Sequence, residues 1–195
     1  MSNLEDYYKI KSTQNVSSLL LKSFKYFNNK DKVALDLGCG AGQDTKYLLE
    51  KGFLVTAVDS SVATKMYIDK LPNQDRLIFK NSSFLDFDYK KYNLINSQFA
   101  LPFNPPESFN KMFRKMTNSI EPDGLFVGQL FGVNDSWNVD DSNLTFHNLS
   151  GVKKLFKSFE LLFLYEKDYN GITTSGVKKH WHVFNIIARK TKSEK

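Results

Sequence analysis

A glycine-rich turn between a buried strand and a helix constrains the fold of this chain more than any other feature of its sequence. The apolar run Val33–Leu37 predicts a short strand, and the pattern of Gln43–Lys51 predicts a helix. Between them stand Gly38, Gly40 and Gly42. Glycine allows a positive φ and lets a ligand approach the main chain closely, and the helix start offers unpaired N–H groups. We interpret the turn as a site for a nucleotide-like ligand; the alternative is a tight connection with no ligand.

Two residues beside this turn separate two classes of nucleotide ligand. The dinucleotide fingerprint requires glycine or alanine at position 43, where this chain has Gln43. Asp36 lies inside the strand, two residues before the turn, and an acidic residue there is typical of methyltransferases. The turn therefore favours S-adenosylmethionine over a dinucleotide.

Asp59 ends the second predicted strand, Leu54–Val58, and strengthens this interpretation. A carboxylate at that position can accept hydrogen bonds from both ribose hydroxyls of a nucleoside cofactor. The alternative is that Asp59 caps a following helix, since aspartate is a favoured N-cap. Ser60 or Ser61 could serve equally well as the cap, which would leave Asp59 free for ribose.

The order of predicted elements indicates an α/β fold. Predicted strands and helices alternate along the chain, starting with a helix over about 12–27, which favours a parallel sheet with helices on both faces. The last two strands, about Glu160–Tyr165 and His182–Ala188, have no helix between them and should pair antiparallel. We therefore predict a Rossmann-like three-layer sandwich whose seven-stranded sheet is mostly parallel. The last strand should be antiparallel and lie between the strands that start near Leu125 and Glu160.

Longer stretches resemble one enzyme family. The segment VALDLGCGAGQDTKYLLEKGFLVTAVDSS is similar to the first two motifs of class I S-adenosylmethionine-dependent methyltransferases. The segments SQFALPFNPPESF, FVGQLFGVNDSW, TFHN and KHWHVFNIIARK resemble a bacterial subgroup related to the tellurite-resistance methyltransferases. The resemblance runs from about Asp31 to Lys190 and implies one methyltransferase domain over 1–195, with residues 1–30 as a helical segment that covers the cofactor site.

The resemblance also implies a set of residues that bind S-adenosyl-L-methionine. Ser83 stands where the family usually has an acidic residue for adenine, so Ser83 or packing by Phe84 should hold that ring. Asn96 and Ser97 stand where the family presents a main-chain carbonyl to the methionine ammonium. The expected cofactor-binding residues are Asp36, Gly38, Cys39, Gly40, Asp59, Ser60, Ser83, Phe84 and Ser97.

The segment Phe103–Glu107 suggests a second kind of substrate. Methyltransferases that act on amino groups of bases carry Asn-Pro-Pro and an aromatic residue directly after the fourth strand. Here Asn104 comes several residues later and Glu107 replaces the aromatic residue. We interpret the segment as a loop into a helix, with Pro106 in its first turn; base methylation is the alternative.

The start of the last strand predicts the acceptor side of the site. Ligands of open parallel sheets bind beyond the carboxyl ends of the strands, and an antiparallel last strand begins there. His180 and His182 stand at this start and, having equal parity, point to one side, with Trp181 on the other. We predict both histidines as catalytic residues. Nearby candidates for the same rim are Asn134, Asp135, Trp137, Tyr7 and Tyr8.

Two alternatives concern these histidines. Trp181 and His182 could instead be structural, closing the end of the sheet by packing. A metal site of His147, His180 and His182 lacks strong ligand spacing, so we expect no metal.

Composition limits the partners. The net charge is +6, but the lysines and arginines are scattered, so we expect no nucleic-acid partner. A single cysteine, a polar start and the lack of a long apolar run lead us to expect a cytoplasmic protein with no membrane partner. The expected function is in-line methyl transfer to a small-molecule nucleophile, with acceptor and oligomeric state left open. The alternatives are a non-catalytic module that binds S-adenosylmethionine and, less favoured, a nicotinamide-dependent oxidoreductase.

Overall fold

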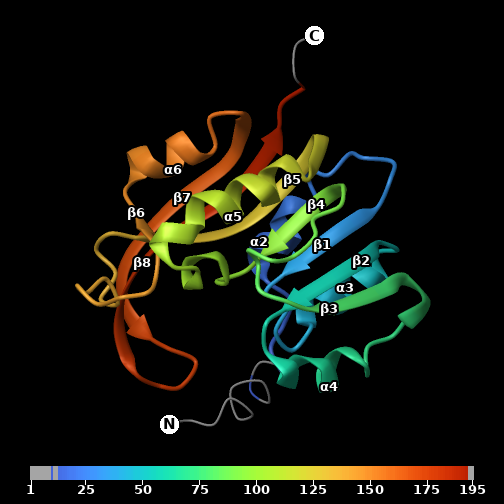
Figure 1. Ribbon diagram of the computed structural model, residues 1–195, viewed down its shortest axis with the longest axis horizontal. Coiled ribbons are helices and arrows are strands. Elements are labelled where there is room, and N and C mark those ends of the chain that lie inside the picture. The colour runs from blue at the N-terminus through green and yellow to red at the C-terminus, as the bar shows by residue number, and fades with distance from the viewer. Residues whose placement is uncertain (1–9, 11–12, 193–195) are drawn as a thin grey trace.

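The computed structural model describes Ile10 and residues 13–192, arranged around one twisted sheet (Figure 1). The helices are α2 (Ser18–Ser23), α3 (Gln43–Glu50), α4 (Lys65–Ile68), α5 (Pro106–Asn118) and α6 (Leu149–Leu155), with short 3-10 helices at Val62–Thr64, Gln74–Arg76 and Leu101–Phe103. The strands are β1 (Val33–Leu37), β2 (Leu54–Asp59), β3 (Leu77–Asn81), β4 (Tyr92–Ser97), β5 (Ile120–Gly132), β6 (Phe146–His147), β7 (Phe159–Ile172) and β8 (Lys178–Lys190).

The strand order confirms the predicted topology. The sheet runs β3-β2-β1-β4-β5-β8-β7, and β1 to β5 are parallel to one another. β8 lies between β5 and β7 and is antiparallel to both, as predicted. One strand is additional: the two-residue β6 pairs in parallel with the end of β5.

Helices cover both faces because the buried strands carry apolar side chains on both. In β1, Leu35 and Leu37 pack into a core with α5 and α6. Ala34, of opposite parity, packs into a second core with α2 and α3. Asp36 shares the parity of Ala34, so its carboxylate lies on the α2–α3 side of the sheet, at the edge where the parallel strands end.

Two elements differ in length from the sequence prediction. The first helix is much shorter, because the backbone N–H of Ser17 donates to the Asp44 carboxylate and its hydroxyl donates to Gln98, so the helix begins only at Ser18. The predicted start at Ser12 lies outside the described residues. The β7–β8 hairpin is longer, since pairing continues to Ile172–Lys178, well beyond the last β5 partner of β8 (Figure 1).

No helix in the described part of the chain is long and apolar enough to cross a membrane.

Candidate active site

The glycine turn after β1 closes tightly against neighbouring backbone. Gly38, Gly40 and Gly42 have φ of 83°, 51° and 81°. The N–H of Gly38 donates to the Val58 carbonyl at 2.8 Å. A Cβ on Gly38 would lie 2.2 Å from the Cβ of Ala100, so no larger residue fits there without a shift of the backbone. Glycine is therefore required both by conformation and by space.

Asp59 at the end of β2 is fixed by the same turn. Its Oδ2 accepts the N–H of Gly40 at 2.9 Å, and its Oδ1 accepts the N–H of Ser61 at 2.9 Å. The N-cap of the 3-10 helix that follows is Ser61, so Asp59 accepts the N–H of the cap residue but is not itself the cap. Because each carboxylate oxygen has a second lone pair, Asp59 can still accept hydroxyl hydrogen bonds.

Asp36 is a buried carboxylate in a polar network. Its Oδ2 accepts the Thr45 hydroxyl at 2.5 Å, and its Oδ1 accepts the side-chain amide of Asn96 at 2.8 Å. The same amide donates to Asp44 at 3.0 Å. Burial, and then the nearby Asp44 charge, raise the pKa of Asp36 to about 7. The described surroundings thus hold two carboxylates close together, which favours a cation between or beside them.

A row of amide side chains extends this network across the sheet. Gln98 donates to Asn96 at 2.6 Å and accepts from Gln129 of β5 at 2.9 Å. Gln129 in turn lies 3.4 Å from the amide oxygen of Asn185 in β8. Ser17, just before α2, donates its hydroxyl to Gln98 at 2.7 Å. The amides therefore connect the end of β1 to β8.

One cavity of about 350 Å³ joins the glycine turn to this amide row. Residues just before and within α2 line it, and so does Lys167 of β7. The lining residues are Gln14, Asn15, Ser17, Ser18, Asp36, Gly38, Cys39, Gly40, Ala41, Gln43, Asp44, Gln98, Phe99, Gln129, Lys167 and Asn185.

Comparison with known proteins identifies a methyltransferase domain. A family model described as a methyltransferase domain matches residues 34–124, which hold the glycine turn, Asp36 and Asp59. The chain therefore carries a methyltransferase domain over these residues, and its fold is similar to that of S-adenosylmethionine-dependent methyltransferases.

Solved structures share the fold of this methyltransferase. TehB from Haemophilus influenzae is 18% identical with a TM-score of 0.77, and the match covers 96% of this chain and 67% of TehB. The N-methyltransferase NodS from Bradyrhizobium japonicum, in complex with S-adenosyl-L-homocysteine, is 12% identical with a TM-score of 0.68 over 98% of this chain and all of its own. At such identities the likeness is one of fold. A search of curated protein sequences gave no match.

The methyltransferase cavity takes in part of the predicted cofactor set. Asp36, Gly38, Cys39 and Gly40 line it, and burial raises the pKa of the Cys39 thiol. The other five residues lie outside its lining. Among them, Ser83 is exposed and donates its hydroxyl to Asp86 at 2.7 Å. Phe84 is half-buried, with its ring edge beside Gly38. Ser97 is buried, and its hydroxyl donates to the Leu37 carbonyl at 2.8 Å, while Asp59 ends β2 and Ser60 follows it.

His180 and His182 do not line the methyltransferase cavity. Both face the acidic side chains of β7: His180 Nε2 lies 2.5 Å from Asp168, and His182 Nε2 lies 2.8 Å from Glu166. The buried His182 also accepts the N–H of Asn134 on Nδ1 at 3.0 Å and packs on Gly132. The equal parity of the two histidines is as predicted, but their side of the strand is the one away from the cavity.

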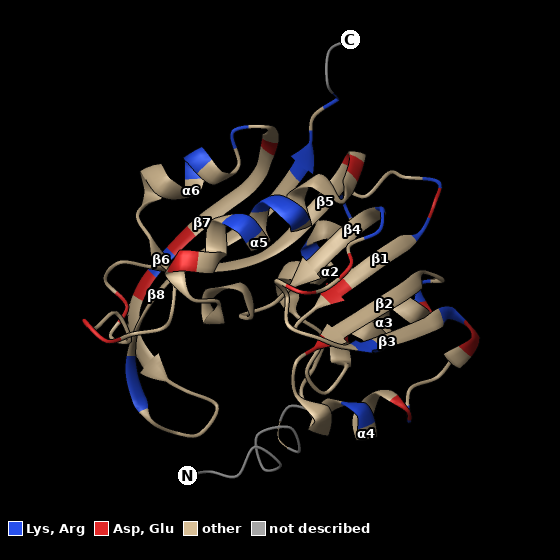
Figure 2. Ribbon diagram, viewed as in Figure 1, with Lys and Arg blue, Asp and Glu red and all other residues tan. Residues whose placement is uncertain are grey.

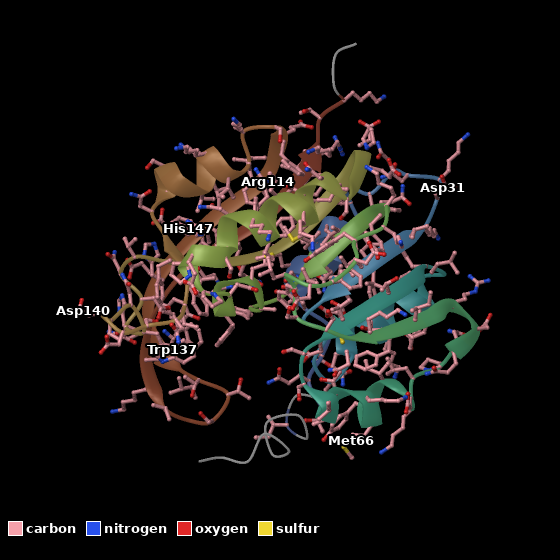
Figure 3. The ribbon with its side chains drawn as sticks, viewed as in Figure 1. Asp31, Met66, Arg114, Trp137, Asp140 and His147 are labelled. Carbon is pink, nitrogen blue, oxygen red and sulfur yellow. The ribbon has the colours of Figure 1, made fainter. Side chains whose placement is uncertain are left out.

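Trp181, of opposite parity, lies on the cavity side. Its ring centroid is 6.1 Å from that of Phe99, which lines the cavity, and 5.6 Å from that of Trp137. Figure 3 labels Trp137, which lies near the β7–β8 hairpin. The buried Lys179 ammonium lies 4.0 Å from the Trp137 ring and 4.4 Å from the Trp181 ring, and it pairs with the buried Asp135. This group fixes the loop after β5 to the start of β8.

The Asn-Pro-Pro segment does not reach the cavity. Asn104 donates its amide to the Leu101 carbonyl at 2.9 Å and does not line the cavity, as expected for a loop into α5. Tyr7 and Tyr8 lie outside the described residues. Among the described residues no cluster of three or more His, Cys, Asp or Glu side chains could hold a metal ion.

Sequence reasoning missed the amide row. Gln129 and Asn185 are single polar residues inside the apolar strand sequences LFVGQLF and HVFNIIA. A polar side chain that a buried strand retains needs a hydrogen-bond partner or a ligand, so this pattern was the available signal.

Proposed function

We propose that this methyltransferase transfers the methyl group of S-adenosylmethionine to a small-molecule nucleophile bound along the amide row. One observation carries the proposal: a single cavity joins the glycine turn to Gln98, Gln129 and Asn185. A donor at the turn and an acceptor at the amides would then share one enclosed space.

The residues at the turn fit the cofactor. The space beside Gly38 and Gly40 admits a ligand to the main chain, and Asp36 and Asp44 give that end of the cavity a negative charge suited to a cationic donor. S-adenosylmethionine supplies a methyl group on a positively charged sulfur. We propose that Asp59, with Ser60 beside it, accepts the ribose hydroxyls, and that Phe84 packs on adenine beside Ser83. The Ser97 main chain would bind the methionine ammonium.

The proposed role of the protein in the reaction is positioning rather than proton transfer. The titratable side chains that line the cavity, among the described residues, are Asp36, Cys39, Asp44 and Lys167. None of them lies in the amide row. Holding the acceptor in line with the sulfonium supplies most of what methyl transfer needs. Side-chain amides can both donate to and accept from the acceptor, which orients it.

Phe99 and the residues before α2 would exclude water from the reacting atoms. Phe99 lines the cavity, and Gln14, Asn15 and Ser17 line it as well. This contact supports the prediction that the N-terminal segment covers the cofactor site. His180 and His182, which face β7, we now propose as residues that hold the hairpin rather than as catalytic residues.

The experiment is to incubate the protein with methyl-labelled S-adenosylmethionine and fractionated small molecules from a bacterial lysate, and to identify the labelled product. Gln129→Leu should lower turnover at least about tenfold while cofactor affinity changes less than about twofold, because only the acceptor half of the cavity changes. Asn28→Leu, at an exposed position before β1 that does not line the cavity, is the matched control and should leave both unchanged. Cofactor binding without transfer to any fraction would instead favour a non-catalytic binding module.

A further inference from the structure

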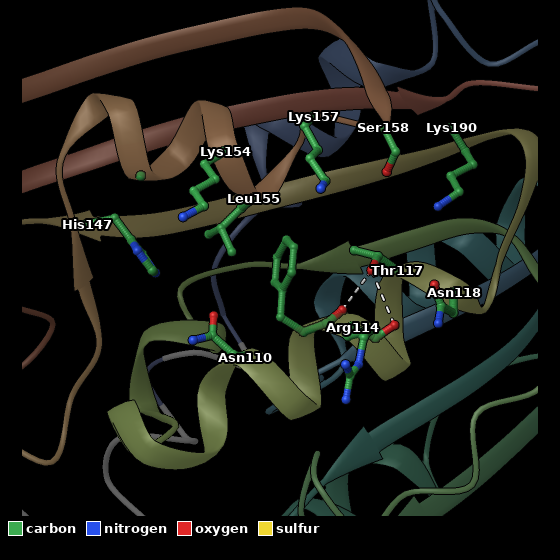
Figure 4. Close-up of a pocket in the computed structure, with 12 residues that line it drawn as sticks. Asn110, Arg114, Thr117, Asn118, His147, Lys154, Leu155, Lys157, Ser158 and Lys190 are labelled. Atoms are coloured by element: carbon green, nitrogen blue, oxygen red, sulfur yellow. Dashed lines mark hydrogen bonds between the residues drawn. The ribbon is translucent and has the colours of Figure 1, made fainter.

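A second hollow lies between α5 and α6, on the opposite face of the sheet from the active-site cavity (Figure 4). Its volume is about 600 Å³, within the range of small-molecule sites. One face of α5 forms its floor and one side, and α6 with the turn after it forms the other. It shares no lining residue with the active-site cavity.

The rim of this α5–α6 cleft is positively charged. Arg114 lies on the α5 side, Lys154 and Lys157 on the α6 side, and Lys190 at the end of β8 (Figure 4). No acidic residue is among those that line it, and within the described chain none of the four cations has a carboxylate at ion-pair distance. Figure 2 shows basic residues on both α5 and α6.

Among the described residues no carboxylate pairs with these cations, although the Lys190 ammonium lies 4.7 Å from the centroid of the Phe159 ring. Burial, and then the nearby Lys91, lower the pKa of Lys190. Lys91 itself donates to the carbonyl of Asn118, a residue that lines the cleft. Like charges repel one another at short range, so each cation of the cleft would favour the binding of an anion among them.

The interior of the cleft combines an apolar surface with an unpaired polar atom. Phe113 of α5 and Leu155 of α6 are the large apolar side chains that line it. His147 lies at one end, its ring centroid 4.9 Å from that of Phe109, and its buried Nε2 has no hydrogen-bond partner in the described chain. Burial lowers the pKa of His147 to about 4, so the ring is uncharged at neutral pH. A buried polar atom without a partner is rare and costs free energy unless a ligand or water contacts it.

We propose that the α5–α6 cleft is a binding site for a compact, multiply phosphorylated small molecule. Its phosphates would bind Arg114, Lys154, Lys157 and Lys190, and its uncharged part would lie on Phe113 and Leu155. A nucleic-acid backbone offers the same phosphate chemistry. The compact ligand is favoured because the cations surround a hollow with an apolar floor rather than forming an extended stripe.

The test is isothermal titration calorimetry of the full chain with inorganic tripolyphosphate, at about 0.15 M ionic strength. The double variant Lys154→Gln/Lys157→Gln should bind at least about tenfold more weakly, because two charge-assisted contacts are lost. The matched control, Lys46→Gln/Lys80→Gln, removes the same charge from exposed positions on α3 and β3 and should bind within about twofold of the unchanged chain. Thermal melting verifies that both variants are folded.

Two results would overturn the proposal. If both double variants bound tripolyphosphate equally weakly, or if the unchanged chain did not bind it, the cleft would not be a specific phosphate site. Tighter binding of a short single-stranded oligonucleotide than of tripolyphosphate, lost in the cleft variant, would assign the cleft to nucleic acid instead. Because neither measurement uses the methyl donor or turnover, failure here is distinguishable from failure of the methyltransferase assignment.

Discussion

At the scale of single residues, Asp36 links the stability of the protein to pH. Its pKa is about 7 in the folded chain against 3.8 as the ordinary value. Between these values the folded state keeps a proton that the unfolded state has lost. Stability from this group is therefore fully present below pH 4 and is lost as the pH rises through about 7.

We expect the free energy of unfolding of Asp36→Asn to depend less on pH than that of the unchanged chain, most clearly between pH 4 and 7. Asparagine keeps the contact area but cannot ionise, so the variant should be the more stable one at neutral pH, without cofactor. Urea unfolding at a series of pH values measures this. Parallel pH profiles for the two proteins would mean that Asp36 ionises as readily folded as unfolded.

Asp59→Ala should weaken binding of S-adenosylmethionine by roughly 1–3 kcal/mol, because ribose hydroxyls lose a charged acceptor. Gly40→Val should abolish binding, since a side chain would fill the space beside the turn. Calorimetry on folded variants measures both. Asp59 also holds the N–H groups of Gly40 and Ser61, so Asp59→Asn is the informative control. Asp59→Asn keeps an acceptor oxygen and should lose less affinity than Asp59→Ala. If Asp59→Ala bound the cofactor as tightly as the unchanged chain, the role of Asp59 would be limited to its hydrogen bonds with Gly40 and Ser61.

At the scale of elements, the β7–β8 hairpin and the loop after β5 depend on each other. Lys179 is buried among aromatic rings and pairs with Asp135, and burial lowers the pKa of that lysine. The Asp135 carboxylate also accepts the N–H of Trp137 at 3.0 Å and that of His182 at 3.3 Å. The Lys179–Asp135 pair therefore holds the aromatic residues beside Phe99 in place, although neither Lys179 nor Asp135 lines the cavity.

Lys179→Met should lower the free energy of unfolding by about 3–5 kcal/mol, because it leaves the Asp135 charge buried without its partner. The double variant Asp135→Leu/Lys179→Met removes both charges and should recover part of this loss. Urea unfolding of both variants provides the comparison. A double variant no more stable than the single one would show that the hydrogen bonds of Asp135, and not its charge, hold the loop.

At the scale of the whole molecule, the antiparallel β8 between β5 and β7 closes a sheet that a dinucleotide-binding fold would continue in parallel. The folded chain should accordingly respond to the nucleoside of S-adenosylmethionine and not to a nicotinamide cofactor. S-adenosylhomocysteine at a hundred times its dissociation constant should stabilise the chain by about 2.7 kcal/mol, seen as a higher melting temperature. NADH at the same concentration should leave the melting temperature unchanged; a shift of similar size would revive the oxidoreductase alternative.

The sequence alone determined the sheet and the glycine turn, because both depend on local patterns. The run Val33–Leu37 with its three glycines defines one strand–turn–helix unit, and the lack of a helix before His182 forces a final hairpin. These features follow from short-range sterics and apolar periodicity, which are readable in single segments.

Only the tertiary structure decided how the amide row is assembled. Gln98 follows β4, Gln129 lies in β5 and Asn185 lies in β8. They meet only because β8 inserts beside β5. Parity predicted that His182 and Trp181 face opposite sides, but which side faces the cavity depends on how β8 is registered against β5. A register is a property of paired strands, so no single strand sequence could fix it.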